Sequence, residues 1–189
     1  MRAIQLKKAV TKGSSVTNTE YTNSYIYEND SLAFFSHPEG YVTKDNNTFK
    51  YVYQYKDHLG NIRLSYANIG TTSAPQLEVI EESNYYPFGL KHRGYNPQTS
   101  PLGNSVAQRW KFGGKELDES LGLGTYDFGA RNYNPELGRW MNIDPLAEDM
   151  RKHSPYNYAF DNPISFIDPD GMAPGRQKQV IAPIHWRKM

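Results

Sequence analysis

The stretch FKYVYQYKDHLGNIRLSY, residues 49–66, decides the fold. In its first half, the aromatic residues at the odd positions 49–55 share one face of an extended chain, and the residues between them share the other. The segment DHLGN (57–61) then supplies a polar turn, in which Gly60 can adopt a positive φ. The alternation resumes at Ile62, Leu64 and Tyr66. We therefore expect a hairpin of two antiparallel strands.

Similar patterns occur on both sides of this hairpin. Alternating residues flank a turn at Glu28–Asp30, and a third pair of strands is predicted between Leu77 and Tyr86. A single hairpin cannot bury one of its faces, but stacked copies can. The sequence predicts an all-β fold of antiparallel hairpins that form a curved sheet. One short helix is expected near residues 145–152, with Asp144 as its N-cap and Pro145 in its first position.

The composition changes along the chain and suggests five segments. Residues 1–20 are basic and rich in Ser and Thr and are predicted to be poorly ordered. Residues 21–90 carry the hairpins, and residues 91–106 form a predicted flexible loop rich in Pro, Gly, Ser and Asn. Residues 107–172 form a second β-rich unit, and residues 173–189 form a basic tail.

Composition excludes several classes of function. The net charge of +1 and the pI near 7.9 give no reason to expect a nucleic-acid partner. The absence of Cys excludes disulfides, a zinc ribbon and a thiol nucleophile. The five His residues lack metal-ligand spacing, so we expect no metal and no cofactor. No apolar run is long enough to span a bilayer, and no signal peptide is visible.

Two Asp-Pro steps stand out in the last third of the chain. They occur in RWMNIDP (139–145) and in SFIDPDGM (165–172). A residue before proline is restricted to extended or turn geometry, so both carboxylates are expected at fixed bends. Asp144 and Asp168 can be a helix cap and a turn residue, or they can form a pair of acids in which one is protonated and the other ionised. The sequence alone leaves both interpretations open.

The stretch YQYKDHLGNIRLSY (53–66) resembles a YD-repeat, and residues 126–172 resemble the repeat-associated core domain of RHS/YD-repeat proteins. The second resemblance includes, in order, Gly-Arg, Asp-Pro, Tyr-x-Tyr, Asn-Pro and Asp-Pro-x-Gly. It implies a strip of β-structure that forms a hollow shell, with the core domain (107–172) at its end. It also implies that the chain is secreted or exposed at the cell surface as part of an exported RHS protein. Any export signal would then lie on a longer parent chain.

In many RHS proteins the core domain is an aspartyl autoprotease that cuts after the Asp-Pro-x-Gly-Leu phrase and releases a C-terminal segment, often a toxin. By resemblance, Asp144 and Asp168 match the acid pair, and Arg139 matches the arginine near them. The matching cut lies between Met172 and Ala173. The implied partner is the chain's own C-terminal segment or the remainder of a longer shell.

The chain departs from the family pattern in several ways. Met172 stands where the family usually has Leu, and Pro174 follows closely. The tail after the predicted cut is too short for a catalytic toxin domain, and the repeats are too few to close a shell, so the chain resembles the end of a longer protein or an orphan cassette. Two rival hypotheses remain: a non-catalytic shell or adhesion fragment, and a carbohydrate-binding module in which Tyr side chains stack on cell-surface glycans.

Overall fold

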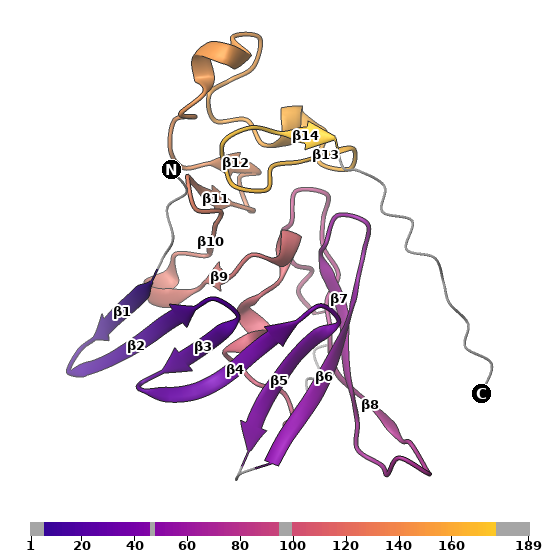
Figure 1. Ribbon diagram of the computed structural model, residues 1–189. Helices are drawn as coiled ribbons and strands as arrows, with labels where there is room; N and C mark the ends of the chain where they lie inside the picture. The colour runs from indigo at the N-terminus through magenta and orange to yellow at the C-terminus, as the bar shows by residue number, and fades with distance from the viewer. Residues whose placement is uncertain (1–5, 46–47, 95–99, 177–189) are drawn as a thin grey trace.

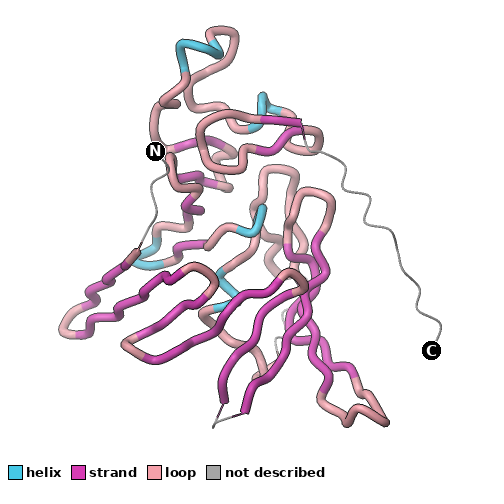
Figure 2. Tube along the Cα trace, in the orientation of Figure 1, coloured by secondary structure: helices cyan, strands magenta, loops and turns pink. Residues whose placement is uncertain are grey.

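The computed structural model describes residues 6–45, 48–94 and 100–176. Almost all regular structure in these ranges is antiparallel β, and no helix there reaches seven residues. The few helical turns are short and lie outside the large sheet (Figure 2). The predicted all-β fold of antiparallel hairpins is therefore confirmed.

One large sheet contains every strand of the first half of the chain (Figure 1). Its spatial order follows the sequence order, so each strand pairs with the next one along the chain. This meander is what short polar turns between alternating segments produce. The strands are β1 Lys7–Lys12, β2 Ser15–Thr22, β3 Tyr25–Glu28, β4 Ser31–His37, β5 Gly40–Asp45, β6 Thr48–Lys56, β7 Ile62–Asn68 and β8 Leu77–Glu82.

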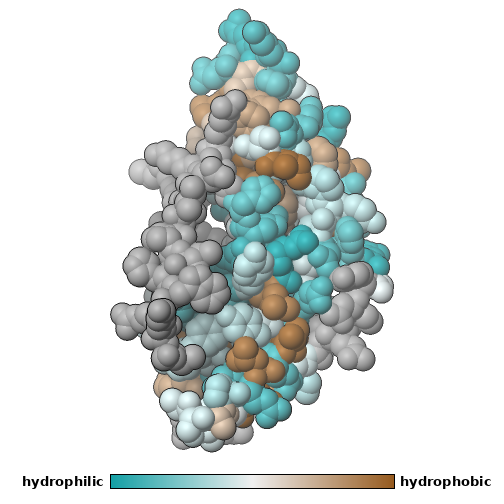
Figure 3. Space-filling model, turned by 90° about the vertical axis from the view of Figure 1, so that its right-hand side faces the viewer, coloured by the Kyte–Doolittle hydropathy of each residue, from teal (hydrophilic) through white to brown (hydrophobic). Residues whose placement is uncertain are grey.

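The two faces of β6 have opposite environments. Val52 is 1% exposed, whereas Phe49, Tyr51 and Tyr55 are each more than half exposed. On its buried face, the sheet packs against a segment that crosses it, and together they form one apolar cluster. Its members are Ile26, Phe34, Tyr41, Val52, Ala67 and Ile80 from the sheet, and Val106 and Ala107 from the crossing segment. The aromatic row thus covers the outer face rather than the core. Apolar residues also lie exposed among polar ones on the side that faces right in Figure 1, as Figure 3 shows.

The N-terminal segment differs from its prediction. Within residues 1–20, which were expected to be poorly ordered, β1 and most of β2 form a hairpin that turns at Gly13, where φ is +61°. Residues 1–5 lie outside the described part. The hairpin is fixed by tertiary contacts, among them an ion pair of 3.0 Å between Lys8 Nζ and Glu116 Oε1. A contact between residues so distant in sequence leaves no local pattern.

The predicted loop at residues 91–106 is also more ordered than expected over its second half. Residues 95–99 lie outside the described ranges, but Ser100 donates a backbone hydrogen bond of 3.0 Å to the Ile80 carbonyl. The Asn104 side chain accepts hydrogen bonds of 3.0 Å from the backbone N–H groups of Val106 and Ala107. Val106 is 5% exposed and belongs to the core. This part of the segment is therefore packed against the sheet.

A second unit sits above the sheet in Figure 1. It contains a four-stranded sheet of β9 Leu117–Asp118, β10 Thr125–Asp127, β11 Asn132–Asn134 and β12 Arg139–Trp140, and a pair formed by β13 Phe166–Ile167 and β14 Gly175–Arg176. Its 3-10 helices, and those that lead into it, are η1 Ala107–Arg109, η2 Phe112–Gly114, η3 Ser120–Gly122, η4 Ala147–Met150 and η5 Ala159–Asp161. Aromatic rings form most of its core: Phe112, Tyr126, Phe128, Tyr133, Trp140, Tyr158 and Ala159. Of the predicted tail, only residues 173–176 are described.

The helix expected near 145–152 is present only as η4, a single 3-10 turn. Its N-cap is Leu146 rather than Asp144, and none of its residues is buried. Most stabilisation of helices in proteins comes from packing an apolar face, and η4 has none to extend it into an α-helix. The carboxylate of Asp144 still accepts a hydrogen bond of 2.7 Å from the Leu146 N–H.

Candidate functional site

The two predicted aspartates converge on one arginine, Arg131. Its Nη1 lies 2.9 Å from Asp144 Oδ2, and its Nη2 lies 3.1 Å from Asp168 Oδ2. The three side chains are between 0% and 3% exposed. The structure therefore brings the residues of the two Asp-Pro steps together in the interior of the second unit. We call this group the Asp–Arg–Asp cluster.

The arginine in this cluster is not the one that the sequence indicated. Arg139 is exposed, and its neighbour on β12, Trp140, points into the core. Arg131 takes the predicted place, with its guanidinium 4.3 Å from the centre of the Trp140 ring. Successive residues of an extended chain face opposite sides, so the alternation that buries Tyr133 also turns Arg131 inward. That spacing was the one available signal in the sequence, because a buried arginine is unusual without a partner.

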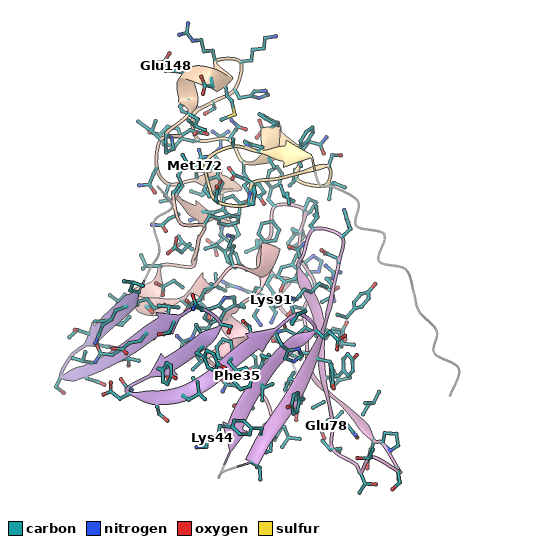
Figure 4. All side chains as sticks on the ribbon, viewed as in Figure 1. Phe35, Lys44, Glu78, Lys91, Glu148 and Met172 are labelled. Carbon is teal, nitrogen blue, oxygen red and sulfur yellow. The ribbon has the colours of Figure 1, made fainter. Side chains whose placement is uncertain are left out.

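The backbone that precedes the predicted cut wraps around the Asp168 carboxylate. Oδ1 of Asp168 accepts hydrogen bonds from the N–H groups of Gly171 at 2.8 Å and Met172 at 3.2 Å. Arg131 Nε donates to the Gly171 carbonyl at 2.5 Å. Gly171 has φ +78°, and a Cβ there would lie 3.0 Å from the backbone nitrogen of Arg131, so any other residue would be strained at this position. We call residues 168–172 the DPDGM loop. Figure 4 labels Met172, which is half-buried, within the second unit, and Glu148 at the outer tip of that unit.

Burial dominates the electrostatics of Asp168. Removal of water raises the pKa of this carboxyl above its ordinary value of 3.8. The Gly171 N–H and the Arg131 guanidinium favour the ionised form and oppose this shift without reversing it. A raised pKa makes Asp168 the better proton donor, which is one of the two roles that an acid pair requires.

The cluster can act chemically in two ways. Two carboxyls beside one guanidinium can share a proton and activate water toward a nearby peptide carbonyl. The same three charges can instead form a buried ion triad that fixes the DPDGM loop. Past Ala173 the chain runs into β14, which pairs with β13. Within the described ranges, no three His, Asp or Glu residues are grouped so that they could hold a metal ion.

The chain resembles several much larger proteins in sequence. It is 34% identical over 156 residues to salivary gland surface protein 1 of Aedes aegypti, which covers 82% of this chain and 4% of that protein. It is 34% identical over 118 residues to toxin subunit YenC2 of Yersinia entomophaga, which covers 60% of this chain and 11% of that protein. It is 28% identical over 181 residues to the tRNA3(Ser)-specific nuclease WapA of Bacillus spizizenii, which covers 85% of this chain and 7% of that protein. No family model matches the chain.

The fold also resembles a solved structure. A chain in the crystal structure of TcdB2-TccC3 aligns with this protein at a TM-score of 0.60 and 22% sequence identity. The alignment covers 88% of this protein and 8% of the TcdB2-TccC3 chain. This likeness shows the fold, an antiparallel β-architecture found within a much larger protein. In the part of the chain that the structure describes, no helix is long and apolar enough to cross a bilayer.

Together, the sequence matches show that the chain is related to RHS-type proteins. It spans only 4–11% of the length of these relatives. It therefore matches only a small section of each of these relatives.

Proposed function

We propose that the chain is the C-terminal core segment of an RHS-type protein, that it forms the end of a β-shell, and that it cuts itself between Met172 and Ala173. One observation carries the proposal: Asp144 and Asp168 share the guanidinium of Arg131, while Asp168 binds the N–H of Met172, the residue before the predicted cut. The relationship to RHS-type proteins supports the same reading.

In this reaction one carboxyl accepts a proton from water as the water oxygen bonds to the Met172 carbonyl carbon. The other carboxyl donates a proton to the Ala173 nitrogen as the carbon–nitrogen bond breaks. The products are a carboxylate at Met172 and an amine at Ala173. The raised pKa of Asp168 favours Asp168 as the proton donor, which leaves Asp144 as the base. Arg131 holds both side chains at fixed positions, and such positioning is a main source of catalytic rate.

The test is the intact mass of the purified chain after prolonged incubation. We expect the wild type to separate into residues 1–172 and 173–189, and Asp168→Asn and Asp144→Asn to stay whole. Asp149→Asn, at an exposed position in η4, is the matched control and should be cut like the wild type. If the wild type stays uncut, the three buried charges stabilise the structure of a non-catalytic shell segment and have no role in cleavage.

The outer face of the large sheet favours a second function, binding of cell-surface glycans. Rings form a connected row across the strands of this face, with Tyr25 and Phe35 at 5.2 Å and Phe35 and Phe49 at 6.3 Å between centroids. Tyr51 and Tyr55 are 56% and 64% exposed on the same face. Exposed aromatic rows of this kind mark interaction surfaces.

Binding to a panel of immobilised glycans tests this second function. Tyr51→Ser and Tyr55→Ser should lower the measured affinity, because they remove rings from the outer face. Gln54→Ala lies between them on β6 but on the opposite face, so it should leave the affinity unchanged. Equal binding by all three variants would exclude the aromatic face as the site.

A further inference from the structure

Lys115 contacts the DPDGM loop from the large-sheet side. Its Nζ donates a hydrogen bond of 2.6 Å to the Pro169 carbonyl, and it lies 5.1 Å from the centre of the Phe128 ring. Arg131 holds the Gly171 carbonyl of the same loop. Two cations thus bind two carbonyls on either side of Asp170, one in an exposed contact and one in a buried contact.

The position of Lys115 is set by a tight turn at residues 110–116. Trp110 and Glu116 form an antiparallel bridge across this turn, and Gly113 and Gly114 have positive φ values of 58° and 68°. Asn61, in the turn between β6 and β7, accepts a hydrogen bond of 2.8 Å from the Gly113 N–H through its Oδ1 atom. The large sheet therefore fixes the turn that carries Lys115.

The next residue, Glu116, binds this turn to the first hairpin of the sheet. Its carboxylate receives hydrogen bonds from Lys8 Nζ at 3.0 Å and from the Tyr21 hydroxyl at 2.7 Å. Arg109 Nη1 lies 3.6 Å from the same carboxylate, which is only 10% exposed. Burial and the Glu116 carboxylate raise the pKa of Tyr21, so its hydroxyl keeps the proton that it donates. Glu116 directly follows Lys115, so these contacts anchor the end of the turn that carries Lys115.

We propose that Lys115 positions the DPDGM loop for cleavage and that the Glu116 contacts make this position depend on the docking of the β1–β2 hairpin. The proposal rests on the self-cleavage proposed above and adds a condition to it: the cut requires a fully packed sheet. Misplacement of reacting groups by about 1 Å can lower a rate on the order of a hundredfold, so a contact remote from the reacting bond can control it.

The first test follows the cleavage rate by intact mass. Lys115→Met should slow cleavage by about tenfold or more, since it removes the hydrogen bond to Pro169. Lys115→Arg keeps a donor and should recover most of the rate, which a purely steric role would not require. Glu116→Gln and Tyr21→Phe should slow cleavage, while Glu20→Gln, which alters only the exposed Lys7–Glu20 pair on the same hairpin, should not.

The second test does not depend on cleavage. In an Asp144→Asn chain, amide hydrogen exchange at Gly171 and Met172 reports how firmly the loop is held. Exchange at these two amides should be faster in Lys115→Met and Glu116→Gln and unchanged in Glu20→Gln. Unchanged exchange in Lys115→Met would overturn the positioning role. An uncut wild type with the expected exchange pattern would overturn self-cleavage and leave the loop contact of Lys115 standing.

Discussion

Arg131 is the residue that joins the members of the Asp–Arg–Asp cluster. It lies between two buried carboxylates, stacks on Trp140 and binds the backbone of the DPDGM loop. Folding removes each of these groups from water, which costs desolvation free energy. The interactions among them offset this cost only while all the partners remain in place. The cluster should therefore tolerate the loss of Arg131 poorly.

Replacement of Arg131 by Met should lower the free energy of unfolding by about 3–5 kcal/mol, because it leaves two buried carboxylates without their cation. Denaturant unfolding of the freshly purified, uncut wild type and variant checks this. Arg139→Met removes an exposed arginine from the neighbouring strand and should change the free energy by no more than about 0.5 kcal/mol. Similar losses from the two substitutions would mean that the buried ion pairs contribute nothing.

The raised pKa of Asp168 predicts a specific dependence of stability on pH. The folded chain retains a proton on this carboxyl at pH values where the unfolded chain has lost it, so the folded state is favoured at low pH. This contribution is complete below the ordinary pKa of 3.8 and is lost as the pH rises through the raised, folded-state pKa.

Unfolding free energies of the wild type and of Asp168→Asn, measured from about pH 3.5 to 6.5, isolate this contribution, because other groups cancel in the difference. The wild type should lose stability relative to the variant as the pH rises. If the wild type instead gains stability relative to Asp168→Asn as the pH rises, then Arg131 lowers the pKa of Asp168 below 3.8.

At the scale of elements, strands could be predicted from the sequence, but the face that each strand buries could not. Period-two alternation located β3, β4, β6 and β7, since alternation is a local property. On β6, however, both faces carry apolar residues, and the smaller Val52 rather than the Tyr row meets the crossing segment. The partner of a face lies elsewhere in the sequence, and no local pattern encodes it.

The same reason explains which parts of the candidate site the sequence could predict. Asp144 and Asp168 carry a local signal, because each precedes a proline. Arg131 and Lys115 act through contacts with residues far along the chain, at separations of 37 and 54 positions. The hairpin β1–β2 was missed for a similar reason, since part of what holds it in place is the contact of Lys8 and Tyr21 with Glu116, far along the chain.

At the scale of the whole molecule, the large sheet and the second unit are joined by polar contacts as well as by apolar packing. His58 and Asn61, in one turn of the sheet, reach the Ile164 carbonyl and the Gly113 N–H of the second unit. The Glu116 carboxylate accepts hydrogen bonds from Lys8 Nζ and the Tyr21 hydroxyl, which lie on the first two strands of the sheet. Since hydrogen bonds require exact geometry, these contacts fix the orientation of the second unit on the sheet, which apolar contacts alone would leave adjustable.

The β13–β14 pair lies on both sides of the predicted cut, with Phe166 and Ile167 before it and Gly175 and Arg176 after it. Scission would convert one continuous polypeptide into two pieces, which in the described residues remain paired at two positions of β13 and β14. Each backbone hydrogen bond in such a pair contributes only about 1 kcal/mol, so this pairing by itself would not retain a dissociated peptide in dilute solution. Under the proposed function, cleavage of the chain and release of the cut segment would then be separate events. Enclosure of the segment by the rest of a shell, rather than its affinity for the core, would determine when it is released.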